Sequence, residues 1–157
     1  MSKLVDEVRD LFKRNHSLVI STVSPRGNPQ SSLVVYVSDG DVLYAMTGEG
    51  THKVKNIKKK PLVSVTIPFY KNLLHRLITR APPASIMFKA DAEIISYNEE
   101  EPRRLFKQHM GMEPPDTPNE GHVWLRLKPR RRVTCYGVGI PLWEMRKPEK
   151  AYKVVKL

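Results

Sequence analysis

Residues 46–56 read Met-Thr-Gly-Glu-Gly-Thr-His-Lys-Val-Lys-Asn, which predicts a strand that turns on two glycines into a basic helix. Glycine lets the backbone approach a ligand closely, and a hydroxyl residue such as Thr51 can cap the new helix. The free amides and the dipole of a first helical turn favour an anion, and Lys53 adds a full charge there. The junction therefore has the chemistry of a phosphate site. An ordinary connection with a capping threonine and a solvated lysine gives the same pattern, so this segment alone leaves both interpretations open.

The hydrophobic pattern before this junction changes from helical spacing to strand spacing. Apolar residues at helical spacing predict an amphipathic helix over residues 3–15, and a period of two predicts strands over 17–23, 30–37 and 42–47. The Asp-Gly pair at residues 39–40 is typical of a tight hairpin. An antiparallel meander of three strands therefore leads into the junction.

Further short strands are expected after the junction. A helix over 51–60 should end at Pro61, and a fourth strand over 62–67 should end at Pro68. Residues 69–83 are expected to leave the sheet. The remaining expected elements are a strand over 84–96, a helix over 99–110 capped by Asn98, a surface loop over 112–121, and two strands over 122–127 and 133–137 connected by residues 128–132. Six or seven short strands with few helices between them predict a mostly β fold, a closed or nearly closed antiparallel barrel with flanking helices.

Length and composition limit the class of protein. A chain of 157 residues is about one domain long, so residues 1–157 are expected to form a single domain with a full core. One cysteine, Cys135, excludes an intrachain disulfide and indicates a reducing compartment. The apolar runs are too short or too interrupted for a signal peptide or a membrane span, so we expect a soluble, cytoplasmic protein. The spacing of the histidines predicts no metal site, and no grouping of Ser, His and Asp predicts a catalytic nucleophile.

The charge is strongly positive, with 27 Lys and Arg residues against 16 Asp and Glu residues and a net charge of +11. The excess is concentrated in residues 53–60, in residues 126–132 and in the tail from Arg146 onward. Such clusters can bind a phosphate-bearing small molecule, the backbone of RNA or DNA, or only water. An anion is therefore the expected partner.

The order of these elements resembles the pyridoxamine phosphate oxidase-like family of flavin-binding split barrels. The resemblance is strongest over residues 18–67, above all in the run 42–57 and the segment 61–65, and it returns more loosely over 123–136. It implies a split barrel that forms a homodimer and binds flavin mononucleotide (FMN) at the subunit interface. The implied activity is that of an oxidoreductase, which transfers hydride or electrons between the flavin and a nicotinamide dinucleotide or a small organic substrate.

The resemblance also implies which residues bind the cofactor. They fall in the strand before the hairpin, at the end of the strand after it, in the phosphate turn and late in the last strand: Ser31, Ser32, Leu33 and Val34; Met46 and Thr47; Thr51, His52 and Lys53; and Tyr136. The backbone of Met46 and the hydroxyl of Thr47 would face the ring or the ribityl chain, and Tyr136 would border the ring. The resemblance names no catalytic side chain.

Three positions depart from the pattern of the vitamin-oxidising members. Ser31 and Tyr36 stand where those proteins carry an arginine and a lysine, and His52 stands where they carry an arginine next to the lysine of the turn. The phosphate clamp is therefore weaker in charge, and pyridoxamine phosphate is a poor candidate for the substrate. The chain is closer to the branch that includes flavin reductases and deazaflavin-dependent proteins.

Two alternatives remain open. The first is a reductase of the same fold that uses a deazaflavin, whose longer phosphate and polyglutamate tail would suit the basic clusters. The second, which the sequence favours least, is a basic barrel without enzymatic activity that binds nucleic acid, with Tyr36, Tyr44 and Tyr136 as its stacking residues. Trp143, in a short apolar segment, would either shield the flavin across a dimer or anchor the C-terminal tail.

Overall fold

The computed structural model describes residues 2–77, 80–116 and 121–157 of the chain. Its strands are β1 (Ser17–Val23), β2 (Pro29–Ser38), β3 (Leu43–Gly48), β4 (Leu62–Phe69), β5 (Ala84–Ser96), β6 (His122–Tyr136) and β7 (Tyr152–Lys156). Its helices are α1 (Lys3–Arg14), α2 (His52–Lys59), α3 (Leu73–Leu77), α4 (Glu100–Met110), the 3-10 helix η1 (Leu142–Arg146) and α5 (Pro148–Ala151). The expectation of a mostly β fold with flanking helices is confirmed.

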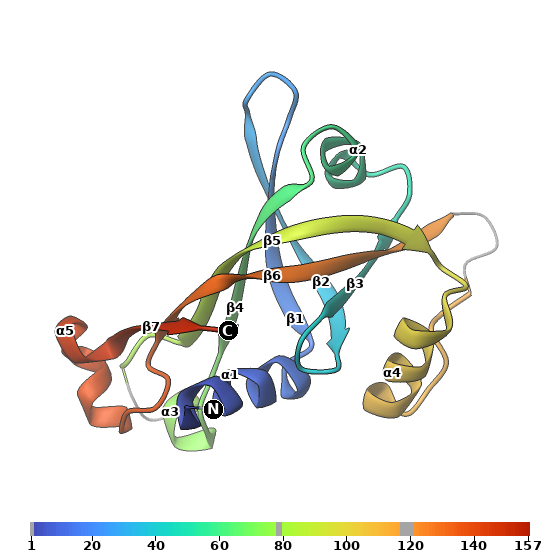
Figure 1. Cartoon of the computed structure of the whole chain (residues 1–157). Coiled ribbons are helices and arrows are strands. Elements are labelled where there is room, and N and C mark those ends of the chain that lie inside the picture. Colours follow the sequence, from blue (N-terminus) through green and yellow to red (C-terminus); the bar gives the residue numbers. More distant parts are fainter. Residues whose placement is uncertain (1, 78–79, 117–120) are drawn as a thin grey trace.

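The strands form one antiparallel sheet that closes on itself. Their order is β3-β2-β1-β4-β5-β6-β7, and β3 also pairs with β6 over six residue pairs, from Leu43↔Leu127 to Gly48↔His122. Strands β1 to β6 therefore make a barrel, and β7 extends the sheet beyond β6 (Figure 1). Helix α2 lies at one end of this barrel, beside the projecting β1–β2 hairpin, and α1 lies at the other end (Figure 1).

The main core fills the barrel because each strand alternates between an inward and an outward face. Leu18 and Ile20 of β1 are completely buried, as are Val8 and Phe12 of α1. The ring centroids of Phe12 and Phe88 lie 5.3 Å apart, so α1 packs directly on the side chains of the barrel. Burial of its apolar stripe, rather than intrinsic propensity alone, stabilises this helix.

A second core lies on the outside of the barrel, where α4 covers parts of β2, β3, β5 and β6. Its buried members are Val37, Tyr44, Ile95, Leu105, Phe106 and Trp124. Trp124 is fully buried, and its indole N–H donates to the carbonyl oxygen of Tyr97 at 3.1 Å. The residues that α4 covers therefore form a cluster separate from the main core inside the barrel.

The prediction of two last strands connected by residues 128–132 is wrong, because β6 runs through this segment. Lys128 pairs with Asp91, and the register shifts so that residues 130–132 of β6 stand opposite Lys89 of β5. A β-bulge of this kind accommodates extra residues in one strand without ending the pairing. The run of basic residues is therefore a strand and not a turn.

Two element boundaries also differ from their predictions. Pro68 does not end the fourth strand, since it pairs with Ser85. A proline near a strand end removes only one backbone N–H from the hydrogen bonds between the strands. Asn98 does not cap the next helix, because Glu99 holds the cap position. The N–H of Glu99 bonds to the carbonyl oxygen of Ser96 at 3.2 Å, which places Asn98 in a turn before the helix.

The remaining differences lie in irregular segments. Phe69 still belongs to β4; the described residues 70–77 and 80–83 lie outside the sheet, as expected, and contain α3, whereas η1, α5 and β7 were not predicted. β7 pairs with the end of β6, from Arg132↔Lys156 to Tyr136↔Tyr152. The loop expected over 112–121 falls partly on residues 117–120, outside the described residues. Within the described ranges, no helix has the length and apolar content that a membrane crossing requires.

Candidate functional site

A short turn carries the chain from β3 to α2, and two hydrogen bonds fix its shape. The N–H of Glu49 donates to the carbonyl oxygen of Gly121 at 2.9 Å, which ties the turn to the start of β6. The hydroxyl of Thr51 donates to the carbonyl oxygen of Gly48, also at 2.9 Å. A cavity of about 570 Å³ lies against this turn, lined by these four residues and Gly50.

The first turn of α2 keeps its amide groups available to a ligand. Thr51 occupies the N-cap position, but its side chain makes no capping hydrogen bond, because its hydroxyl is turned to Gly48. The prediction that Thr51 is the N-cap residue is therefore confirmed, but the prediction that its hydroxyl caps the helix is wrong. The first amides of a helix have no acceptor within the helix, so an anion at this end can accept from them.

Lys53 lies in the same turn and reaches back to the end of β3. Its ammonium donates to the hydroxyl of Thr47 at 3.1 Å, and Thr47 is 7% exposed. Burial lowers the pKa of Lys53. Since its partner in this contact is a neutral hydroxyl, a phosphate placed beside the ammonium would supply the charge that the contact lacks.

Asn56 fixes the orientation of α2 on the barrel. Its side-chain amide donates to the hydroxyl of Thr22 at 3.0 Å and to the side-chain oxygen of Gln30 at 3.4 Å. Val54 and Ile57 of the same helix are buried in the main core. The first turn of α2 is therefore held rigidly against β1 and β2, as a binding site requires.

The barrel is split next to this turn, where β2 and β3 separate. β2 pairs with β1 over seven residue pairs but with β3 over only three, from Tyr36↔Ala45 to Ser38↔Leu43. If the pairing continued, Thr47 would stand opposite Val34. In an antiparallel sheet the backbone N–H and C=O groups of alternate residues point to opposite sides of a strand. Among the described strands none pairs with this second edge of β2 before residue 36, so its backbone groups face the split.

The four candidate residues of β2 divide between two faces. Val34 is 8% exposed and belongs to the main core, so it can offer a ligand only its backbone. Leu33 is 70% exposed on the outer face, and the hydroxyls of Ser31 and Ser21 lie 2.7 Å apart on that face. Ser32 is half-buried. The side chains of Ser31 and Leu33 therefore face the outside of the barrel, where a ligand or a second chain can contact them.

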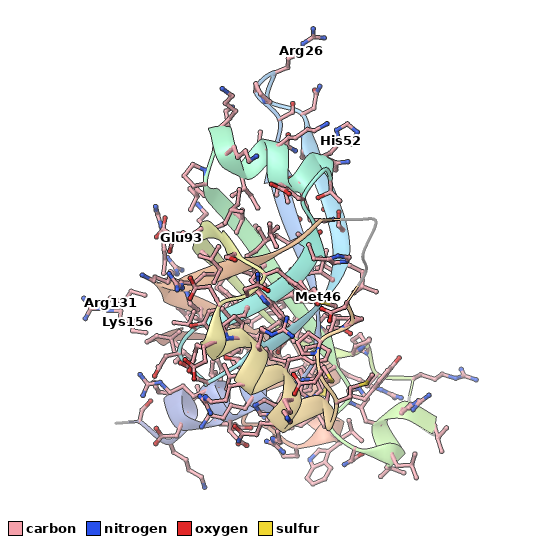
Figure 2. All side chains as sticks on the ribbon, turned by 90° about the vertical axis from the view of Figure 1, so that its right-hand side faces the viewer. Arg26, Met46, His52, Glu93, Arg131 and Lys156 are labelled. Carbon is pink, nitrogen blue, oxygen red and sulfur yellow. The ribbon has the colours of Figure 1, made fainter. Side chains whose placement is uncertain are left out.

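Met46 and His52 lie at the edges of the turn (Figure 2). The side chain of Met46 packs under α4, where its sulfur accepts a hydrogen bond from the hydroxyl of Tyr97 at 3.4 Å. His52 is exposed at the start of α2 and points outward (Figure 2). Because its side chain is packed under α4, Met46 can contact a cofactor only through its backbone.

Tyr136 lies far from the turn within one chain. β6 is 15 residues long, so at about 3.3 Å per residue its ends are about 45 Å apart along the strand. Tyr136 is at the end away from the turn, where its hydroxyl donates to the carbonyl oxygen of Met145 at 2.6 Å. The chain thus brings Thr47, Thr51 and Lys53 together and leaves Tyr136 apart.

Two residues of the turn region were missed from the sequence. Asn56 looks like one more polar residue in a lysine-rich helix, but it lies between the apolar positions Val54 and Ile57, which is a signal that it faces the barrel. Gly121 is far away along the chain, and only the pairing of β3 with β6 brings it to the turn.

The structure also bears on nucleic-acid binding. Tyr36 is completely buried and Tyr44 is 6% exposed, so neither ring can stack on a base. In the second basic cluster, Arg130 forms an ion pair with Asp91 at 2.9 Å. Two of the three stacking residues that such binding would need are therefore inside the protein. Among the described residues, no cluster of three or more His, Cys, Asp or Glu side chains has the arrangement of a metal site.

Comparison with known proteins assigns the family. The family model of pyridoxamine 5'-phosphate oxidase matches residues 4–135. The chain belongs to this family. A search of curated proteins gives no match.

Several solved structures share the split-barrel fold of this chain at low sequence identity. General Stress Protein 26 from Bacillus anthracis is 18% identical with a TM-score of 0.60, over 99% of this chain and 100% of that chain. An F420 reductase is 19% identical with a TM-score of 0.58, over 77% and 91% of the two chains. A heme binding protein from Mycobacterium smegmatis is 15% identical with a TM-score of 0.65, over 99% of this chain and 59% of that chain. At these identities the likeness shows the fold alone.

Proposed function

We propose that this family member is an FMN-dependent oxidoreductase that holds the phosphate of FMN at the start of α2. The observation that carries the proposal is the contact of the Lys53 ammonium with the Thr47 hydroxyl, 3.1 Å apart, beside the open first turn of the helix. The Lys53 ammonium, the Thr47 hydroxyl and the first amides of the helix can all donate hydrogen bonds, and a phosphate offers acceptors to them. The donor set therefore fits the anionic end of FMN.

The split between β2 and β3 is the place we propose for the ring system. The second edge of β2, from Ser31 to Val34, presents backbone donors and acceptors that suit the polar edge of a flavin. FMN, when bound, supplies the acceptance and donation of hydride or electrons. The residues of the chain bind the phosphate, orient the ring and limit its contact with water. The substrate we expect is a small organic molecule or a nicotinamide dinucleotide.

A partly exposed row of side chains supports a homodimer. One residue from each of six neighbouring strands lies in this row on the outer face of the sheet: Leu33, Val19, Thr66, Met87, Thr134 and Val154. Leu33 is 70% and Val154 51% exposed. The row has four apolar side chains and two threonines, and a partly exposed row of this composition across a sheet face suits a surface that a partner covers.

A dimer through this outward face would also give Tyr136 a role. Tyr136 lies between Ser85 and Tyr152 in the next row of the same face. It is far from the turn of its own chain, so it can border a flavin only in the site of a second chain. The proposed site is therefore shared between two subunits.

The visible absorbance spectrum tests the cofactor. The purified protein, as isolated or after mixing with FMN at micromolar concentration and removing the excess, should show the bands of bound flavin. A protein that carries no flavin and binds none on titration would refute the proposal.

Light scattering after gel filtration tests the dimer. We expect twice the chain mass of 18.1 kDa, and Leu33→Glu should shift the protein towards the monomer because it replaces an exposed apolar side chain of this row by a charge. Met112→Glu is the matched control, since Met112 is 60% exposed on the loop after α4. A wild-type monomer, or equal effects of the two changes, would exclude this face as the interface.

A deazaflavin is the second candidate cofactor. Four exposed lysines follow the phosphate turn: Lys55, Lys58, Lys59 and Lys60. A longer anionic tail would find these charges next to the turn, whereas the single phosphate of FMN does not need them. Parallel titrations with FMN and with the deazaflavin discriminate, because only one of the two should bind tightly.

A further inference from the structure

A second cavity, of about 630 Å³, lies between the α3 segment and η1. Its volume is in the range of sites that hold small organic molecules. Leu74, Ile140, Leu142 and Trp143 supply most of its apolar wall. Figure 1 places α3 and η1 at the end of the barrel away from α2, so this cavity is not part of the turn that α2 begins.

The walls of the cavity are held in place by Lys71 and His75. The ammonium of Lys71 donates to the carbonyl oxygen of Gly137 at 2.7 Å and also to that of Ile140. His75 is 1% exposed; its ring accepts from the backbone N–H of Lys71 at 3.2 Å and lies 2.9 Å from the carbonyl oxygen of Pro82. One ring nitrogen therefore accepts and the other donates. The segment of α3 is thus fixed to the turn after β6, and the cavity is preformed.

The charge of the cavity is positive. Lys71 and Arg146 line it, and no carboxylate is among its described lining residues. Two of the three N–H groups of Lys71 are used by backbone carbonyls, which leaves one for a ligand. Burial lowers the pKa of Lys71, although the carboxylate of Glu7 acts in the opposite direction, and an anion in the cavity would favour the charged form further.

The rim of the cavity carries an unusual amount of exposed apolar surface. Trp143 is 77% exposed and Leu74 is 50% exposed, and both line the cavity. Leu73 and Leu77, each 68% exposed, continue this surface along α3. A solvent-exposed indole next to a cationic pocket offers a contact surface for the apolar part of a ligand.

We propose that this cavity binds a small carboxylate with an aromatic body. The ring would lie against Leu74 and Trp143, and the carboxylate would accept hydrogen bonds from Arg146 and from the free N–H of Lys71. Guanidinium groups suit carboxylates because they can donate two parallel hydrogen bonds. The proposal does not depend on the proposed phosphate site, because none of these residues belongs to the turn before α2.

Calorimetric titration with 2-naphthoate tests the proposal, and 2-naphthylmethanol is its neutral counterpart. We expect one saturable site per chain for 2-naphthoate and binding of the alcohol weaker by roughly tenfold or more, since the alcohol lacks the charge-assisted hydrogen bonds. 2-Naphthoate should also change the fluorescence emission of Trp143. The change should be absent in Trp143→Phe, whose remaining tryptophan, Trp124, is fully buried.

The matched variants are Arg146→Gln and Arg26→Gln, which remove the same charge at the cavity and at the distant tip of the β1–β2 hairpin (Figure 2). Arg146→Gln should lower the affinity for 2-naphthoate by roughly tenfold and leave the affinity for 2-naphthylmethanol unchanged. Arg26→Gln should change neither affinity. Leu74→Asp should abolish binding in a protein that still unfolds cooperatively. Absence of saturable binding at millimolar 2-naphthoate, equal binding of acid and alcohol, or equal effects of the two arginine changes would overturn the proposal.

Discussion

Replacing Lys53 by methionine should weaken FMN binding by roughly ten- to a hundredfold. The change removes the ammonium that contacts Thr47 at 3.1 Å and keeps an unbranched side chain of similar length, so the packing of α2 should persist. A hydrogen bond to a charged group contributes about 1.5–3 kcal/mol, and each 1.4 kcal/mol corresponds to about tenfold in affinity. The first-turn amides of α2 remain, so binding should be weakened and not abolished. Fluorescence titration of FMN at fixed salt concentration measures the dissociation constant.

The same lysine should make FMN binding sensitive to pH on the alkaline side. Burial lowers the pKa of Lys53 below its ordinary 10.5 in the free protein, and a bound phosphate favours the charged form. Binding therefore takes up a proton at alkaline pH, and the affinity should fall as the pH rises through the lowered pKa. In Lys53→Met this alkaline fall should disappear.

Lys55→Met is the matched control, because Lys55 is exposed on the same helix and carries the same charge. It should change the dissociation constant by less than about threefold, since exposed charges contribute little at ordinary salt. Equal losses in Lys53→Met and Lys55→Met would mean that only the general charge of the helix matters. An unchanged dissociation constant in Lys53→Met would remove this lysine from the site and refute the proposed position of the phosphate.

Three further predictions concern stability. The hydroxyl of Tyr36 is buried with no hydrogen-bond partner among the described residues, so Tyr36→Phe should raise the free energy of unfolding in urea by about 1 kcal/mol. Tyr44→Phe is the control: it removes a hydrogen bond with Arg126 and should lower the free energy of unfolding by about 1 kcal/mol. Gly111 ends α4 in the left-handed region with φ of 70°, so Gly111→Ala should lower the free energy of unfolding by about 1 kcal/mol in the same assay. Burial and the neighbouring His109 lower the pKa of His16 below 6.5, so the unfolded chain binds more protons and the free energy of unfolding should fall as the pH drops from about 7 to about 5. His109→Gln should reduce that fall, and a pH-independent stability would contradict the assignment.

Local periodicity predicted most elements of the fold correctly. The alternation along residues 17–23 and 84–96 matches β1 and β5 residue for residue, since the side-chain period of a strand is a property of the chain itself. The basic run of 128–132 was misjudged because a bulge opposite Lys89 depends on the partner strand, which no local pattern shows. β7 was missed because it is short and pairs with β6 only through its position in the sheet.

The candidate site was predictable in part. The glycine turn and the lysine of the following helix can be recognised from sequence because turn and helix-start preferences are local. The hydroxyl of Thr51 was assigned to capping, but it donates instead to Gly48 in a turn that Glu49 ties to Gly121. Such a contact between distant segments exists only after the barrel closes.

The sequence by itself determined where most of the strands and helices lie, the sign of the charge and the presence of a glycine turn before a basic helix, since each follows from side-chain period, backbone preference or composition. Only the tertiary structure decided that β3 closes the barrel on β6, that β2 and β3 part beside the turn, and that the ammonium of Lys53 lies 3.1 Å from the hydroxyl of Thr47. It also decided that Tyr136 stands at the far end of a 15-residue strand. Strand pairing joins segments far apart in the chain, and its register depends on the packing of the whole core, which no short stretch of sequence contains.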